Sequence, residues 1–447
     1  MAKTKAWYGC SALSVRYRAK ALYRMSKANQ KLRIGNVSYA IQLQSRAMGL
    51  FLLHGSFDPD QPTALLDQVV SEFLHGAISM NALAPAAFLL SLLATSIHVA
   101  QADEKTPLLS LDAARKLEST LVNEKNVAVT PENFAFAVLD ESMQNEMKLG
   151  ATNKFYNHRK PMELDKQPAV LMNRDTLYSF AIIDASHGAT IHVPKGDGRY
   201  TSVHVMQHDH VTDNVYYGGG EYAIDPKTVT DFVVVNIRTQ VNPNDPADVS
   251  KANAIQDEYK VSFPSGYTPK AFKAIDWNQE QLKQIKAHYV ESADTRGVSK
   301  TMGARGTISQ DDINVGAAVA TGLLPDQHAW YSFKSYKVKK DICYAATYPV
   351  PGMTNPQSGF YSMTMYGDDL YLHTEEGSSL SNHEIVPDKD GKTFTLHFGH
   401  PQSCGKDAEN LLIAPTDNWT LAFRVYMPDK SVQNNEYKLP EPKPVTH

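Results

Sequence analysis

The sequence predicts a mainly β protein with a helical module, that is, a multi-domain α+β chain. Short apolar stretches with a period of two, separated by turns rich in Gly and Asp, fill residues 168–245. Similar stretches resume at Tyr331, whereas residues 250–325 have apolar side chains at helical spacing. The order of β, helical and β regions predicts separate sandwiches joined by helices.

The chain begins with two segments that we set apart from the fold. Residues 80–102 combine an apolar run with Ala100-Gln101-Ala102 and then polar Asp103, the layout of a signal peptide. Residues 1–79 carry ten Lys and Arg but four Asp and Glu. We interpret 1–79 as a non-native extension from an early start codon, with a transit peptide as the alternative. Cleavage after Ala102 would leave residues 103–447, exported to a periplasmic or extracellular location.

The charge of the exported part excludes some partners. The whole chain has 44 Lys and Arg and 48 Asp and Glu; without the leader 34 and 44 remain, a net charge of −10. An acidic protein is repelled by nucleic acid and by anionic membranes. We therefore expect no nucleic-acid partner. We also expect no integral membrane span once the signal peptide has been cleaved. An unidentified small molecule or glycan remains as a partner.

The cysteines fit an oxidising compartment. Cys10 lies in the discarded leader, which leaves the pair Cys343 and Cys404. They are candidates for a disulfide, and two buried thiols are the alternative. The sequence has no CxxC pair and no phosphate-binding Gly-rich motif, and no cofactor is predicted.

The first domain is predicted over residues 103–245, an N-terminal β-sandwich preceded by helices. Leucines at helical spacing after Pro107 indicate the leading helices. Strands follow at 169–172, 177–183, 190–193, 200–206 and 231–238. Strands at roughly ten-residue spacing indicate an antiparallel sandwich.

The rest of the chain divides into three predicted parts. Residues 246–330 form a helical module, with its clearest helix from Gln279 to Glu291. Residues 331–430 form a second sandwich, with strands at 337–348, 359–366, 370–373, 393–398 and 419–426. Residues 431–447 are a polar tail.

Motifs in both β regions resemble known families. The segment Asn173–Ser179, with Asp184, Arg199-Tyr200 and the pair Asp209 and Asn214, resembles the domain-of-unknown-function family 1254. The later segments resemble its companion, the domain-of-unknown-function family 1214: Gly359–Ser362, Asp390-Gly391, Asn410–Pro415 and Leu421–Pro428. The resemblance implies an immunoglobulin-like sandwich followed by a jelly-roll-like sandwich. It implies no activity.

Polar residues at the ends of predicted strands are the first candidate site. We predict a polar groove between the sandwiches that binds an anionic or sugar ligand, with arginine as the bidentate partner of an anion. The ligand-binding candidates are Asn173, Arg174, Asp175, Tyr178, Arg199, Asp209 and Arg424. The alternative is architectural, because polar turns must satisfy their own hydrogen bonds in any fold.

Histidines supply a second candidate site. On a strand from Arg199 to Val211, His208 and His210 would lie about 6.6 Å apart on one face, close enough for one metal ion. Asp213 would complete a set of two His and one carboxylate. The alternative is an exposed polar face without a metal.

These observations leave the activity open. We predict an exported protein with a binding or structural role in the cell envelope. The alternatives are a metal-dependent enzyme that uses His208, His210 and Asp213, or a hydrolase with two distant carboxylates acting on an envelope polymer or lipid. Nucleophile motifs are absent from the sequence, so the catalytic residues are unknown. The oligomeric state is unknown as well.

Overall fold

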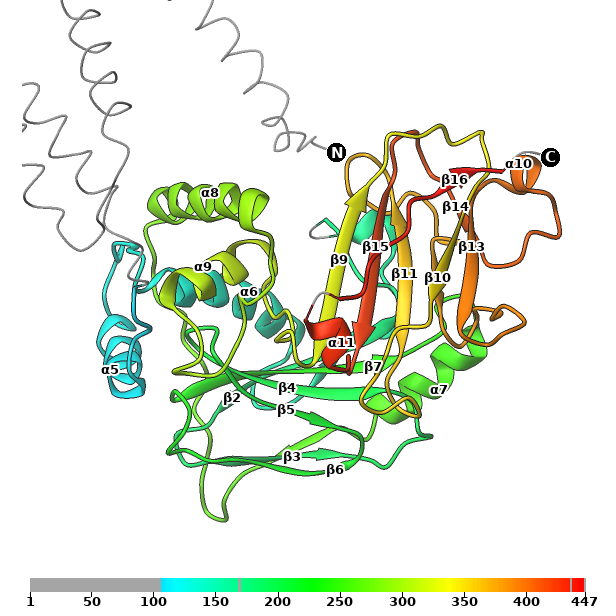
Figure 1. Ribbon diagram of the computed structural model, residues 1–447. Helices are drawn as coiled ribbons and strands as arrows, with labels where there is room; N and C mark the ends of the chain where they lie inside the picture. Colours follow the sequence, from blue (N-terminus) through cyan, green and yellow to red (C-terminus); the bar gives the residue numbers. More distant parts are fainter. Residues whose placement is uncertain (1–105, 168–169, 435, 446–447) are drawn as a thin grey trace, which may run out of the picture. The chain divides into compact units, whose positions relative to one another are not determined.

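The computed structural model describes residues 106–167, 170–434 and 436–445. The predicted extension and signal peptide, residues 1–102, lie outside them. The described chain is mainly β with seven α-helices, and its strands form two sandwiches of two sheets each (Figure 1). The predicted α+β class is therefore confirmed. In the described stretches, no helix is both long and apolar enough to cross a bilayer.

The first sandwich packs a five-stranded sheet, ordered β1-β2-β7-β4-β5, against a three-stranded sheet, ordered β6-β3-β8. Its strands are β1 (Tyr156–Asn157), β2 (Thr176–Asp184), β3 (Ala189–Val193), β4 (Thr201–Gln207), β5 (Thr212–Tyr217), β6 (Gly220–Ile224), β7 (Phe232–Gln240) and β8 (Lys260–Ser262). Every pair is antiparallel. Side chains alternate between the faces of a strand, so Val233, Val235 and Ile237 all enter the core between the sheets.

Seven described α-helices accompany the two sandwiches, and four of them share one core. The helices are α5 (Leu111–Leu121), α6 (Phe134–Leu149), α7 (Pro246–Gln256), α8 (Gln279–Arg296), α9 (Gln310–Val319), α10 (Pro401–Cys404) and α11 (Lys430–Gln433), with a short 3₁₀ turn η1 (Leu164–Lys166). Polar caps fix several starts: Ser110 caps α5, Asn278 caps α8, and Ser309 forms a capping box with Asp312 at α9. Apolar residues of α5, α6, α8 and α9 pack into one cluster, so the leading helices share a core with the helical module.

The second sandwich has two four-stranded sheets, ordered β14-β13-β10-β16 and β12-β11-β15-β9. Its strands are β9 (Ala329–Ser335), β10 (Tyr344–Pro349), β11 (Tyr361–Tyr366), β12 (Ser379–Ser381), β13 (Thr393–Gly399), β14 (Leu411–Ile413), β15 (Thr420–Tyr426) and β16 (Lys443–Pro444). Aromatic side chains fill the space between the sheets, among them Phe394, Phe398 and Phe423. One pair, β13 with β14, is parallel, and the other pairs of this sandwich are antiparallel.

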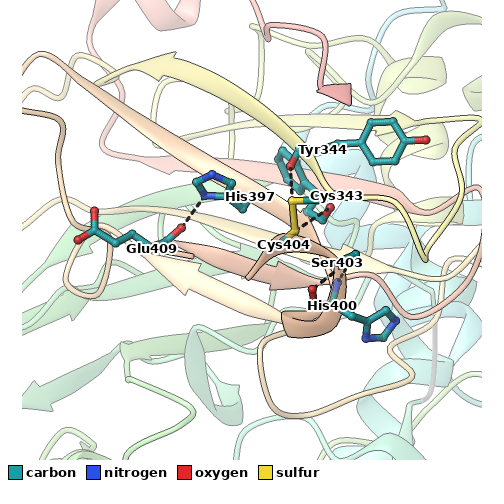
Figure 2. The surroundings of a disulfide bond; sticks show 8 residues. Cys343, Tyr344, His397, His400, Ser403, Cys404 and Glu409 are labelled. Carbon is teal, nitrogen blue, oxygen red and sulfur yellow. Dashed lines mark hydrogen bonds between the residues drawn. A yellow bond between two sulfur atoms is a disulfide. The ribbon is translucent and has the colours of Figure 1, made fainter. Parts of the chain in front are cut away.

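A disulfide closes one end of the second sandwich. Cys343 lies just before β10 and Cys404 lies in α10, and their sulfur atoms are bonded (Figure 2). Both side chains are buried. The bond joins positions 61 residues apart, so it limits the freedom of the unfolded chain between them.

Four predicted strands differ from the structure. The strand predicted at 337–348 begins only at Tyr344, and the residues before it form a loop. The strand from Arg199 to Val211 ends at Gln207, because His210 adopts a left-handed conformation (φ 68°) that turns the chain into β5. Leu171, in the strand predicted at 169–172, is also left-handed and lies in a turn. The strand predicted at 370–373 is a loop that starts with left-handed Leu370. A positive φ is incompatible with an extended strand.

Candidate functional site

Several predicted ligand-binding residues lie where the two sandwiches meet. Asp175, just before β2, accepts hydrogen bonds from Ser362 on β11 (2.5 Å) and from Ser379 on β12. Asn173 donates to the hydroxyl of Tyr426 on β15 (2.6 Å). We call Asn173, Asp175, Ser362, Ser379 and Arg424 the seam, because these buried side chains link one sandwich to the other.

Arg424 supplies the positive charge of the seam. Its guanidinium donates to Thr364 Oγ1 (3.0 Å), Tyr366 Oη (2.8 Å) and the Leu171 carbonyl (2.9 Å). Burial raises the pKa of Asp175, and the attraction of Arg424 opposes that rise. The seam therefore contains both a carboxylate and a cation, and its polar atoms bind protein groups.

Arg174 is also buried beside the seam, although its surroundings differ. One nitrogen donates to the Met162 carbonyl (2.6 Å), and another lies 4.0 Å from the Glu375 carboxylate. Burial lowers the pKa of Arg174, and Glu375 opposes this. Arg174 thus holds the loop before β2 in place.

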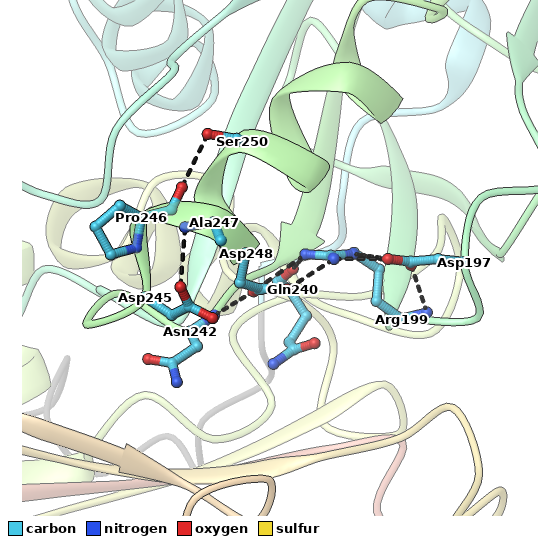
Figure 3. Close-up of polar contacts among 9 residues, drawn as sticks. All are labelled: Asp197, Arg199, Gln240, Asn242, Asp245, Pro246, Ala247, Asp248 and Ser250. Atoms are coloured by element: carbon cyan, nitrogen blue, oxygen red, sulfur yellow. Dashed lines mark hydrogen bonds and ion pairs between the residues drawn. The ribbon is translucent and has the colours of Figure 1, made fainter.

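Arg199 lies in an open pocket of about 410 Å³, apart from the seam. Its guanidinium pairs with Asp197 (2.6 Å) and Asp248 (2.9 Å), as Figure 3 shows. Burial opposes the charge of Arg199, but the hydrogen bonds that it donates to both carboxylates outweigh burial and raise the pKa of Arg199. Asp245, also in this pocket, caps α7 through the amide of Ala247. The charged groups of this pocket are therefore largely engaged with one another or with backbone.

Asp209 lies in the β4–β5 turn and pairs with Arg305 (2.7 Å), which also binds Gln207. Burial raises the pKa of Asp209 against the attraction of Arg305. The pair connects the turn to the loop before α9.

The three candidate metal ligands have other partners. His208 Nδ1 lies 2.7 Å from Glu118 and its Nε2 lies 2.6 Å from Asp140. His210 Nε2 accepts a hydrogen bond from the Gly322 amide (2.9 Å), and Asp213 accepts one from Thr228. Among residues 106–167, 170–434 and 436–445, no three His, Cys, Asp or Glu side chains are arranged to hold a metal ion.

His208 forms a buried ion-pair network instead. Burial alone would lower the pKa of His208, but Asp140 and Glu118 outweigh burial and raise it to about 10. Asp140 also accepts from the Trp277 indole (2.6 Å), and Glu118 from the backbone of Asp231 (2.9 Å). A charged His208 thus ties α5 and α6 to the first sandwich.

A different polar group lies on the face of the five-stranded sheet that is turned away from the three-stranded sheet. Two rows of cross-strand neighbours run over β2, β7, β4 and β5. They are Tyr178, Arg238, Ser202 and Tyr217 in one row, and Phe180, Asn236, His204 and Val215 in the other. We call Ser202, His204, Asn236 and Arg238 the sheet-face cluster. All four side chains are buried, although no polar residue is needed to fill a core.

Each member of the sheet-face cluster has a polar atom that makes no well-formed hydrogen bond in the described part of the chain. These atoms are Ser202 Oγ, His204 Nδ1, Asn236 Oδ1 and Arg238 Nη1. Two neighbours, Tyr200 Oη and His210 Nδ1, share this property. A buried polar atom left without a partner costs about 1–3 kcal/mol. Their concentration on one face distinguishes the cluster from the seam.

Gly322 lies over the cluster. Its amide donates to His210, and its carbonyl accepts from the Arg238 guanidinium. Its φ of 78° suits glycine, and a Cβ there would lie 3.6 Å from Met206 and 3.8 Å from Asn236. The backbone therefore approaches the sheet closely at this point.

Arg238 is a buried cation without a carboxylate partner. Its guanidinium lies 5.5 Å from the ring centre of Tyr178, and no ion pair joins it to any described Asp or Glu. Burial raises the pKa of Tyr331 to about 12 and that of Tyr200 well above its usual value. The nearby phenols therefore stay neutral at physiological pH.

The candidates predicted from sequence include Tyr178 but miss the centre of this cluster. Arg238 and Asn236 lie in the apolar stretch Asp231–Arg238, which predicts a strand. The sequence pattern of this strand could have indicated the cluster, because a strand that is buried in ordinary core on both faces is apolar at every position. Polar residues at alternate positions, Asn236 and Arg238, indicate a second face that is not ordinary core.

Comparison with known proteins agrees with this organisation. The family described as a protein of unknown function, DUF1254, matches residues 152–262, and the DUF1214 family, likewise of unknown function, matches residues 321–430. No curated protein matches the sequence at a significant level.

One solved structure is similar in fold, and a second gives a weaker match. The VPA0106 protein from Vibrio parahaemolyticus is 20% identical, with a TM-score of 0.54, over 71% of this chain and 98% of that one. A putative uncharacterized protein from Burkholderia cenocepacia is 13% identical, with a TM-score of 0.42, over 72% of this chain and 92% of that one. Both family matches occur in order along one chain. The chain thus carries a DUF1254 domain followed by a DUF1214 domain.

Proposed function

We propose that this chain is an exported binding protein that holds a small polar molecule against the sheet-face cluster. One observation carries the proposal: four adjacent buried side chains each keep a polar atom that makes no well-formed hydrogen bond within the described protein, although Ser202 lies near the Tyr200 hydroxyl and His204 near the Gly322 backbone. Native folds pair nearly all their buried polar groups, so a local group of exceptions favours a functional explanation.

The composition of the cluster suits binding of a polar molecule. Arg238 donates only, Asn236 offers a carbonyl acceptor, and Ser202 can do either. The cluster lies across neighbouring strands of a rigid sheet, which positions its groups in advance. Tyr178 and Tyr331 at its border are half-buried, so this border is the proposed entrance.

Three features support export. The apolar run before Ala100-Gln101-Ala102 has the composition of a signal peptide. The pair Cys343 and Cys404 forms a disulfide, a bond typical of oxidising compartments. The net charge after cleavage is strongly negative, which suits a protein that remains in solution. The proposed location is the periplasm or the cell exterior.

Extraction of the native protein tests the binding function. Protein purified from its own cells is denatured, and the released small molecules are identified by mass spectrometry. We expect one polar compound in near-stoichiometric amount, absent from the Asn236→Leu variant. Asn145→Leu, at an exposed position, is the matched control and should retain it. Folded protein that releases no compound would contradict the proposal.

Intact mass spectrometry of the same preparation tests export. The expected mass corresponds to a chain that begins at Asp103 and lacks two hydrogens because of the disulfide. Recovery of the uncleaved chain with two free thiols in the second sandwich would contradict export while leaving the binding function open to the extraction result.

A further inference from the structure

Resting on the proposed function, we infer that the ligand of the sheet-face cluster carries a carboxylate group that pairs with the Arg238 guanidinium. The inference names the chemical class of the ligand, which the unpartnered atoms alone do not specify. It depends on the charge balance around Arg238, on the donors that surround it, and on the absence of a second cation in the described cluster.

The charge balance separates Arg238 from the other largely buried arginines. Arg199 pairs with Asp197 and Asp248, Arg305 pairs with Asp209, and Arg174 lies 4.0 Å from Glu375. Arg424 is attracted by Asp175. Arg238 is as buried as Arg424, at 4% and 3% exposure. Neither guanidinium forms a direct ion pair with a described carboxylate, but Asp175 is among the groups that act on Arg424, whereas only tyrosines are among those that act most on Arg238. A buried charge is strongly unfavourable unless it is compensated.

The protein groups around Arg238 do not supply the missing negative charge. The tyrosines that influence it most are Tyr178, Tyr331, Tyr200 and Tyr426. Burial raises the pKa of Tyr331 to about 12 and that of Tyr426 well above its usual value, so these hydroxyls remain protonated. Neutral hydroxyls donate hydrogen bonds, and a carboxylate accepts about four. Arg238 and its neighbouring hydroxyls thus match a carboxylate.

The charge of the site favours a singly charged group. Burial lowers the pKa of His210 to about 4 and that of His204 well below its usual value, so both rings are neutral near pH 7. Arg238 is then the single cation of the described cluster. A phosphate dianion would leave one negative charge buried and uncompensated, whereas a carboxylate is balanced.

The border of the cluster suits an apolar remainder of the ligand. Tyr178 and Phe180 stack with nearly parallel rings, 6.0 Å apart, beside Arg238 and Asn236 in the sheet. Both rings are half-buried, so they offer apolar faces next to the guanidinium. An aromatic carboxylate is therefore the most informative probe.

Thermal-shift and calorimetric titrations of the purified full chain test the inference. The probes are sodium benzoate and acetate, inorganic phosphate, and uncharged benzyl alcohol and glucose, all at equal ionic strength. We expect the carboxylates to raise the melting temperature and to bind more tightly than phosphate or the neutral compounds. Arg238→Met should weaken benzoate binding at least about 10-fold, because a charge-assisted hydrogen bond contributes roughly 1.5–3 kcal/mol.

Two further variants keep the test decisive. Arg159→Met alters an exposed arginine bound to Asp257 and should leave benzoate binding unchanged. Arg238→Lys keeps the charge but not the fork of donors, so it should bind with intermediate affinity, and circular dichroism checks that each variant folds.

Each outcome bears on one proposal. Carboxylate binding that is lost in Arg238→Met and retained in Arg159→Met supports the inference. Binding of glucose or benzyl alcohol without carboxylate binding overturns the inference and leaves the binding function intact. Phosphate binding that exceeds carboxylate binding, or no response to either carboxylate, overturns the inference as well. Only the extraction from native cells decides the binding function.

Discussion

The seam and the sheet-face cluster are two buried polar groups that differ in how their charges are balanced. In the seam, Asp175 accepts from Ser362 and Ser379 and lies within the influence of Arg424. In the cluster, Arg238 binds one backbone carbonyl and keeps an unpartnered nitrogen. The exposure of Arg424 and Arg238 is nearly equal, so burial does not explain the difference.

This difference separates a structural role from a binding role. A buried charge with a counter-charge is held by its own protein, and removing one partner is strongly destabilising. A buried charge without one already carries that penalty, so its removal should be tolerated. Residues that are unfavourable for stability persist where function requires them.

The His208 network should show the largest loss, because it is a paired charge like those of the seam. Replacing His208 with Gln removes the cation between Glu118 and Asp140 and leaves two buried carboxylates. We expect a loss of about 4 kcal/mol in the free energy of unfolding, measured in urea. His192→Gln, which breaks a surface pair with Glu221, should cost less than about 1 kcal/mol. Equal effects would contradict the comparison.

The pH dependence of this network has a definite sign. The folded pKa of His208, about 10, lies above the 6.5 of a free histidine. Its stabilisation is therefore complete below pH 6.5 and is lost as the pH rises toward 10. The stability difference between the native protein and His208→Gln should shrink over that interval. A difference that grows with pH would show that His208 is buried as a neutral ring.

The seam itself is tested by Asp175→Asn. This substitution keeps the shape but removes the carboxylate that accepts from Ser362 and Ser379 and attracts Arg424, so we expect a loss of about 3 kcal/mol in the free energy of unfolding. Asp257→Asn, at an exposed ion pair with Arg159, is the control and should change it by less than about 1 kcal/mol. If Asp175→Asn lowers the free energy of unfolding no more than its control does, the seam does not have the structural role given to it here.

A smaller effect is expected from His210 at acidic pH. Because burial lowers its folded pKa to about 4, the unfolded chain binds a proton between pH 6.5 and 4 that the folded chain does not. Stability should therefore fall as the pH drops through this range. His210→Asn suits the left-handed backbone and should flatten that decline in an acid unfolding series. If the loss of stability at acidic pH is the same in His210→Asn as in the native protein, other groups cause it.

The sequence predicted the fold well because strand and helix periodicity is local. Alternation in Leu177–Ile183 predicts β2, and the spacing of Leu282, Ile285 and Tyr289 predicts α8. Three strands failed where single residues turn left-handed, at Leu171, His210 and Leu370. None of these is a glycine, so composition alone does not indicate the turn.

The candidate site was predicted only in part. Motif residues such as Asp175 and Arg424 were identified, but they form the seam, since their partners on the other sandwich are hundreds of residues away. The state of a charge depends on such distant partners. The unpaired state of Arg238 therefore became apparent only when Gly322 and the tyrosines were placed around it.

The most direct test of this account compares Arg238→Met with Asp175→Asn by urea unfolding of protein freed of small molecules. We expect the free energy of unfolding of Arg238→Met to stay within about 1 kcal/mol of the native value or to exceed it, because an uncompensated buried charge is removed. Asp175→Asn should lose about 3 kcal/mol. A loss in Arg238→Met as large as that in Asp175→Asn would mean that both groups stabilise the fold alike, and the distinction between them would be lost.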